Sequence, residues 1–131
     1  MFKIIWRKIR RKSPARPRSR IGACEYKQYK GLAYARAIER LEHFNVFYGF
    51  TYNRVAIRNQ KTRWGSCSTK GNLNFNYKLA LLPDDLADYL VVHELCHLGQ
   101  FNHSQKFWDL VGQTVPDYAE KRELLKKWKK V

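Results

Sequence analysis

The pentapeptide His93-Glu94-Leu95-Cys96-His97 has the residue types and the spacing of a zinc hydrolase. On a helix, residues four positions apart lie on one face, so the two imidazoles can reach a single ion. Glu94 lies beside them, where its carboxylate can stay outside the ligand set and still reach a water bound to that ion. We therefore expect His93 and His97 to bind one zinc ion per chain and Glu94 to act as the general base. The alternative is a pair of core histidines satisfied by backbone carbonyls.

A third protein ligand is expected, because catalytic zinc normally has three. His103 stands six residues after His97. Gly99 is a fitting C-terminal cap for the helix, so the chain can turn back there and bring the His103 imidazole to the ion. A glutamate from the last predicted helix, Glu120 or Glu123, is the competing ligand.

The elements that must position these residues are helices around a small sheet. A stripe of apolar residues three or four apart predicts a helix from about Glu25 to Phe47, with Gly49 as its stop. Alternating apolar residues then predict two short strands, which indicate a small antiparallel sheet. A helix that carries the pentapeptide begins at Pro83, and two further helices follow it. The stripe consists of Tyr26, Tyr29, Ala33, Ala37, Leu41 and Phe44, and the strands contain Val55 and Ile57, then Leu73, Phe75 and Tyr77. The predicted fold class is α+β.

Length and charge divide the chain into a basic arm and one domain. The chain has 131 residues and a net charge of +15, and residues 1–20 contain nine basic residues and no acidic one. We expect 1–20 to be a flexible arm and 21–131 to be a single domain. A second basic cluster closes the chain at Lys126, Lys127, Lys129 and Lys130. The arm and these lysines could contact nucleic-acid phosphate, an acidic membrane surface or an acidic protein.

The cysteines and the apolar runs indicate a cytoplasmic protein. Cys24, Cys67 and Cys96 are widely spaced, form no C-x-x-C pair and are odd in number, so neither disulfides nor a cysteine zinc site is expected. Each is interpreted as a small buried hydrophobe in a reducing compartment. No apolar run approaches the ~18 residues of a transmembrane helix, and the N-terminus lacks the features of a signal peptide.

Several motifs follow one another in order between about Tyr52 and Trp128. They are Arg63-Trp64-Gly65-Ser66-Cys67-Ser68, Asn76, Leu79, Pro83, Asp88-Tyr89, Val91-Val92-His93-Glu94-Leu95, Asn102-His103-Ser104, Phe107-Trp108 and Pro116-Asp117-Tyr118. Together they resemble the YgjP-like zinc metallopeptidase family, which is akin to the wider SprT-like group. The resemblance implies a zincin-like fold, zinc on His93, His97 and His103, and Glu94 as the catalytic acid/base. It also implies a polypeptide substrate.

The expected reaction is hydrolysis of peptide bonds by a zinc-activated water, with Glu94 moving the proton. Tyr118, Asn102 and Arg63 are candidate donors to the developing oxyanion. Two further functions stay open: a nucleic-acid-associated protease of the SprT-like kind, and a basic nucleic-acid-binding module in which zinc only braces the fold.

The run from Arg63 to Cys67 has a structural and a functional interpretation. As structure, Trp64 fills the core and Gly65 marks a bend or bulge before the next strand. As function, a glycine-bearing edge strand near the zinc could pair with an extended peptide backbone. The substrate-binding residues themselves are not identified by the sequence.

Overall fold

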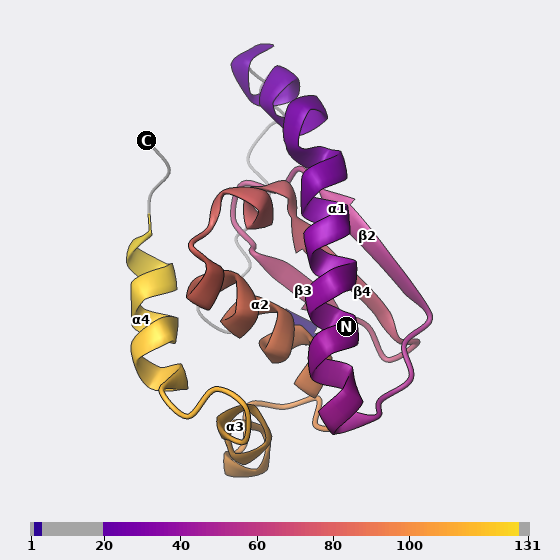
Figure 1. Cartoon of the computed structure of the whole chain (residues 1–131), viewed down its shortest axis with the longest axis vertical. Coiled ribbons are helices and arrows are strands. Elements are labelled where there is room, and N and C mark those ends of the chain that lie inside the picture. Colours follow the sequence, from indigo (N-terminus) through magenta and orange to yellow (C-terminus); the bar gives the residue numbers. More distant parts are fainter. Residues whose placement is uncertain (1, 4–19, 129–131) are drawn as a thin grey trace.

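A 29-residue helix, α1 (Arg20–Tyr48), lies against a sheet in the computed structural model, which describes residues 2–3 and 20–128. Figure 1 shows α1 along the length of the molecule, α2 between α1 and α4, and α3 beyond the end of α2. The other elements are β1 (Phe2–Lys3), β2 (Arg54–Arg58), β3 (Gly65–Cys67), β4 (Asn72–Asn76), the 3-10 helix η1 (Tyr77–Leu81), α2 (Asp84–Cys96), α3 (Gln105–Gly112) and α4 (Tyr118–Lys127). The α+β class and the order of helix, sheet and three helices are as predicted.

Small residues let α1 pack closely on the rest of the chain. Ala33, Ala37 and Leu41 recur at four-residue intervals and are fully buried, so one stripe of the helix faces inward. The helix ends where Gly49 takes a left-handed conformation with φ of 69°, as the sequence indicates. The Asn45 side chain then bonds both backbone groups of Phe50, at 2.8 Å and 2.7 Å.

The sheet is mixed, so the prediction of an antiparallel sheet was wrong in one pairing. The strand order is β1-β3-β4-β2, and β2 pairs with β4 in parallel, with Val55 opposite Leu73. The pairs β3–β4 and β1–β3 are antiparallel. β4 returns from β3 through a tight turn at Gly71 and inserts between β3 and β2, and it therefore runs in the direction of β2. Alternating apolar residues show which face of a strand is buried but not which strand lies beside it.

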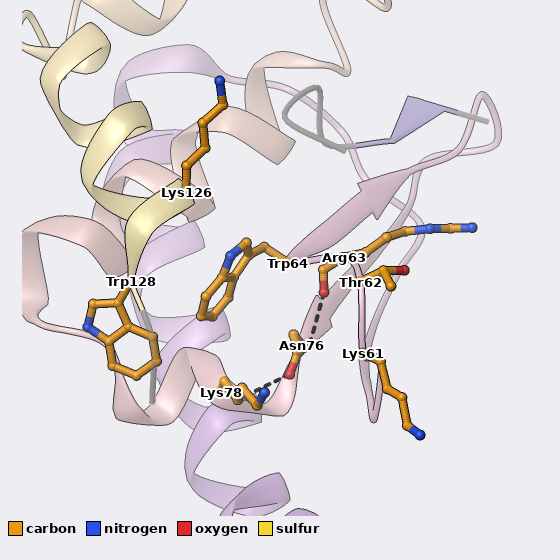
Figure 2. Close-up of a pocket in the computed structure, with 8 residues that line it drawn as sticks. All are labelled: Lys61, Thr62, Arg63, Trp64, Asn76, Lys78, Lys126 and Trp128. Atoms are coloured by element: carbon orange, nitrogen blue, oxygen red, sulfur yellow. Dashed lines mark hydrogen bonds between the residues drawn. The ribbon is translucent and has the colours of Figure 1, made fainter. Parts of the chain in front are cut away.

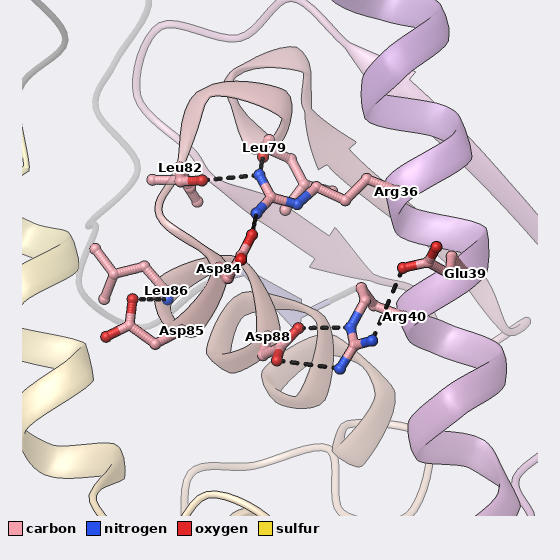
Figure 3. A network of polar contacts seen from close by, with 9 residues as sticks. All are labelled: Arg36, Glu39, Arg40, Leu79, Leu82, Asp84, Asp85, Leu86 and Asp88. Atoms are coloured by element: carbon pink, nitrogen blue, oxygen red, sulfur yellow. Dashed lines mark hydrogen bonds and ion pairs between the residues drawn. The ribbon is translucent and has the colours of Figure 1, made fainter.

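Two arginines of α1 hold the start of α2 in place (Figure 3). Arg36 donates to the backbone carbonyls of Leu79 and Leu82, both at 2.8 Å, and pairs with Asp84. Arg40 donates two hydrogen bonds to the carboxylate of Asp88, at 2.7 Å and 3.2 Å. These contacts satisfy carbonyls at the end of η1 and fix the position from which α2 begins.

Nearly the whole of α2 is buried. From Leu86 to Cys96 the residues are buried, with the exception of Asp88. The helix begins after Pro83 as predicted, and its first turn carries Asp84 and Asp85, which the helix dipole favours there. Its end differs from the prediction: His97 is the C-cap, and Gly49 and Gly71 are the residues with positive φ in the described part of the chain. Gly99 therefore does not act as a left-handed cap.

The predicted basic arm is described only at its two ends. Phe2–Lys3 form β1 and Arg20 begins α1, whereas residue 1, residues 4–19 and the lysines at 129 and 130 lie outside the described residues. Lys126 and Lys127 are exposed at the end of α4. Among the helices that are described, none has the length and hydropathy needed to cross a membrane.

We expect Arg36→Ala to lower the free energy of unfolding by about 2 kcal/mol, because two carbonyls lose a charged donor. Arg54→Ala is the matched control, since Arg54 is exposed on β2, and should change stability by less than about 0.5 kcal/mol. Urea denaturation followed by circular dichroism measures both. Equal stability of the two variants would mean that the Arg36 contacts do not stabilise the fold.

Candidate metal centre

The helix α2 places His93 and His97 one turn apart, with Glu94 between them in the sequence. Both imidazoles are fully buried, and their Nε2 atoms are 3.2 Å apart. Two nitrogens bound to one tetrahedral zinc ion at about 2.0–2.1 Å would be about 3.3 Å apart. The pair therefore has the separation that a shared metal ion requires.

His103 completes a group of three imidazoles from the segment that joins α2 to α3. Its Nε2 atom lies 2.9 Å from Nε2 of His97, and the ligand atoms of the three histidines all lie within 4.8 Å of one another. The group could hold a metal ion. The rival ligands Glu120 and Glu123 are exposed on α4 and are not part of this group.

Neighbouring groups orient the imidazoles through their other ring nitrogens. Nδ1 of His97 lies 3.1 Å from the backbone carbonyl of Gln100, and Nδ1 of His93 lies 3.3 Å from the hydroxyl of Tyr89. When Nδ1–H of His97 donates to that carbonyl, Nε2 keeps its lone pair for a metal. Phe107 stacks on the His97 ring, with centroids 4.4 Å apart and planes 19° from parallel. These contacts hold the nitrogen atoms in place before an ion arrives.

Burial keeps the three imidazoles neutral. It lowers the pKa of His97 to about 4 and that of His103 to about 3, and it holds the pKa of His93 well below its ordinary value. The positive charge of Arg122 lowers the pKa values of His93 and His103 further. Metal ligation needs the neutral imidazole, so protons do not compete for these nitrogens near pH 7.

The carboxyl group of Glu94 is fully buried and forms no hydrogen bond among the described residues. Burial therefore raises the pKa of Glu94 well above its ordinary value. A carboxyl group of this kind beside a metal-binding group is suited to accept and return a proton.

The strand β3 lies directly on Glu94. A Cβ atom added to Gly65 would come within 3.2 Å of Oε2 of Glu94 and within 2.6 Å of the backbone oxygen of Asn74. Glycine is therefore required by close packing at a regular strand position opposite Phe75, and not by the bend or bulge that the structural interpretation expected. Trp64 is partly buried against the core and does not fill it as predicted. The outer edge of β3 is paired with β1, which places Lys3 opposite Ser66.

A family model for the YgjP-like metallopeptidase domain matches residues 6–128 of the chain. This chain belongs to the YgjP-like metallopeptidase family. Its fold is similar to that of the metallopeptidase zymogen of Pyrococcus abyssi abylysin, a crystal structure with 27% sequence identity and a TM-score of 0.62. That similarity covers 70% of this chain and 94% of the abylysin chain. No curated protein sequence matches the chain.

The candidate oxyanion donors of this YgjP-like domain lie in different surroundings. Tyr118 stacks on Trp108 with ring centroids 5.0 Å apart, and the Trp108 ring lies 6.2 Å from that of His103. Asn102 is exposed and directly precedes His103 in the segment between α2 and α3. Arg63 lines a separate pocket, at the start of β3. The role of each as an oxyanion donor stays a prediction.

Sequence reasoning missed three groups around the imidazoles of the YgjP-like domain. Tyr89 lies four residues before His93 on the same helix face, so its spacing contained the signal. Gln100 contributes a backbone carbonyl, which no side-chain type reveals. Arg122 comes from α4; its guanidinium lies 5.4 Å from the centre of the Trp108 ring, and its Nε atom is buried without a partner among the described residues.

The cysteines agree with the sequence interpretation at two of three positions. Cys67 and Cys96 are buried, and burial raises the pKa of each thiol to about 12. Cys24 is exposed near the start of α1, so its prediction as a buried hydrophobe was wrong. It lies outside the stripe that faces the core. All three thiols are free.

We expect His103→Ala to lower the zinc affinity of this YgjP-like domain at least about 100-fold, because loss of a ligand exceeds the 10–100-fold cost of losing an outer contact. His43→Ala makes the same change at an exposed histidine of α1 and should leave the metal content unchanged. Elemental analysis of the full chain after dialysis measures both. A His103→Ala variant with one zinc per chain would exclude His103 as a ligand, and Glu120→Gln would then test the rival.

Two glycines provide a second matched pair. Gly65→Ala should destabilise the protein by about 1–3 kcal/mol, because the added methyl group has no room between Asn74 and Glu94. At Gly31, in α1, an added Cβ meets nothing within 4 Å, so Gly31→Ala should stabilise the helix by about 0.5–1 kcal/mol. Thermal denaturation compares them, and an unchanged melting temperature for Gly65→Ala would contradict the close packing of β3 on Glu94.

Proposed function

We propose that this chain is a zinc-dependent metallopeptidase that hydrolyses peptide bonds in polypeptide substrates. The observation that carries the proposal is the group of three neutral imidazoles beside a buried, partnerless Glu94. Imidazole nitrogens suit zinc, and three protein ligands leave one position of a tetrahedral site open for water or substrate. Zinc bound there would polarise a substrate carbonyl and lower the pKa of water toward about 7.

Glu94 is the proton carrier in this proposal. Beside a dication its carboxylate form is favoured, so the oxygen can take a proton from the attacking water. Burial then favours the neutral carboxylic acid, which can give that proton to the leaving nitrogen. The absence of hydrogen-bond partners among the described residues leaves both oxygens available for these transfers.

The edge of β3 supports an extended polypeptide as the substrate. Gly65 of β3 lies against Glu94, and the outer edge of the strand already forms an antiparallel pair with Phe2–Lys3. A substrate backbone can form the same ladder of hydrogen bonds beside the reactive centre. Because β1 occupies this edge, a substrate bound in this way would displace it.

A purely structural zinc site is the alternative that these observations disfavour. Structural zinc sites are normally closed by four protein ligands, whereas three side chains form the metal-binding group in the described chain. Such a site also has no use for Glu94, whose burial without partners is unfavourable for folding.

We assign the chain to the cytoplasm, and its free cysteines support that assignment.

We expect Glu94→Gln to retain one zinc per chain and to lose at least about 100-fold in hydrolysis of a quenched fluorescent casein, because general acid–base catalysis is lost. The exposed Glu120→Gln is the matched control and should keep full activity. Elemental analysis and a fluorescence assay of the zinc-loaded proteins measure the two quantities. A fully active Glu94→Gln variant would refute the proposed role.

The stability of metal-free wild type and metal-free Glu94→Gln, measured at several pH values, tests the burial of Glu94 independently of activity. In the unfolded chain Glu94 ionises near its ordinary pKa of 4.5, whereas burial keeps it protonated to higher pH in the folded state. Above pH 4.5 the wild type should therefore lose stability relative to Glu94→Gln as the pH rises, until the folded-state pKa is reached. The lowered pKa values of the histidines act equally in both proteins and cancel in the difference.

A further inference from the structure

A second candidate site, which we call the basic pocket, lies at the start of β3 and apart from the metal centre. It has a volume of about 200 Å³ and receives side chains from the segment before β3, from η1 and from the end of α4 (Figure 2). Eight residues line it: Lys61, Thr62, Arg63, Trp64, Asn76, Lys78, Lys126 and Trp128.

Asn76 connects the segments that form the pocket through hydrogen bonds to their backbones. Its side-chain nitrogen donates to the backbone carbonyls of Gln60 at 2.6 Å and Arg63 at 2.9 Å, and its backbone N–H donates to the carbonyl of Trp64 at 2.8 Å. Its side-chain oxygen accepts the N–H of Lys78 at 3.0 Å. The buried amide therefore fixes the backbone from which the basic side chains extend.

The pocket carries four positive charges and no carboxylate in its lining. Among the described residues, Lys61, Arg63 and Lys78 form no ion pair, and Lys126 has a half-exposed pair with Glu123 at 3.5 Å. A single carboxylate of a ligand would engage one or two of these cations and leave the others close together and repelling one another. A ligand with repeated negative charges would use them all.

Two indole rings also line the pocket, and a site that bound its ligand by charge alone would not need them. Trp64 and Trp128 are half-buried, with ring centroids 5.7 Å apart and planes inclined at 68°. Tryptophan faces accept planar rings, and stacking on aromatic side chains is how proteins hold unpaired bases. Acidic peptides would neutralise the lysines, but they would make no use of the indole rings. The volume of about 200 Å³ is below the ~300–1,000 Å³ of most small-molecule sites, so one base or one phosphate fits better than a whole cofactor.

We propose that the basic pocket binds single-stranded nucleic acid, with a base against the tryptophans and the neighbouring phosphates on the surrounding lysines and Arg63. The net charge of +15 would attract such a strand from a distance. This inference does not depend on hydrolysis at the metal centre, and the two can fail separately.

The first test is fluorescence anisotropy of a labelled oligothymidylate with the full chain at several salt concentrations. Lys61→Glu/Lys78→Glu should weaken binding at least about tenfold and reduce the slope of log affinity against log salt by about 1.4, which is two single-strand phosphate contacts at ~0.7 each. Lys70→Glu/Lys106→Glu makes the same charge change at exposed sites outside the pocket and should leave the slope nearly unchanged. Equal losses in the two double variants would overturn the proposal.

The second test addresses the tryptophans. Trp128→Ala should weaken binding about fivefold to a hundredfold through loss of stacking, while Trp128→Phe should retain most of the affinity. Circular dichroism and zinc content show that each variant is folded. Wild-type affinity in Trp128→Ala, or competition by polyglutamate as effective as that by unlabelled oligothymidylate, would show that the pocket recognises charge alone and would refute the proposal.

Discussion

Burial of α2 on all sides is the constraint around which the rest of the fold is arranged. α1, the sheet, α3 and α4 each pack against this helix, so no face of it keeps an extended contact with water. A helix enclosed in this way would ordinarily be apolar all round. Here the helix and its C-cap carry His93, Glu94 and His97, which are polar and fully buried. Burying these polar groups lowers the free energy of unfolding, and burial of the surrounding apolar residues, such as Leu90 and Leu95, offsets that loss.

The surrounding elements act on that helix by contacts of different kinds. Arg36 joins α1 to the end of η1 by charged hydrogen bonds, whereas Phe107 of α3 supports the imidazoles by stacking. β3 brings its backbone close to Glu94, because Gly65 leaves no side chain between the strand and that carboxyl group. The group of three histidines thus depends on elements from both halves of the chain, although His93 and His97 stand one turn apart at the end of one helix.

Local patterns predicted the parts of this fold that local physics determines. The stripe through Ala33 and Ala37, the stop at Gly49 and the one-turn separation of His93 and His97 follow from helix geometry alone. The position of His103 was predictable from a short turn and from the family resemblance. The parallel pairing of β2 with β4 was not, because it depends on a non-local choice of neighbour. The basic pocket was missed for the same reason, since it joins residues from β4, η1 and α4 that share no spacing in the sequence.

The buried thiols Cys67 and Cys96 have a consequence for the donor atoms that a metal ion meets. In the unfolded chain, three cysteines and four histidines are accessible, and zinc binds thiolate as readily as imidazole. Folding encloses two of the thiols and raises the pKa of each to about 12, so neither offers a thiolate near pH 7. The same packing gathers three neutral imidazoles at one point. The native fold therefore favours nitrogen over sulfur coordination before any ion is bound, and among the described residues Cys24 is the thiol that stays exposed.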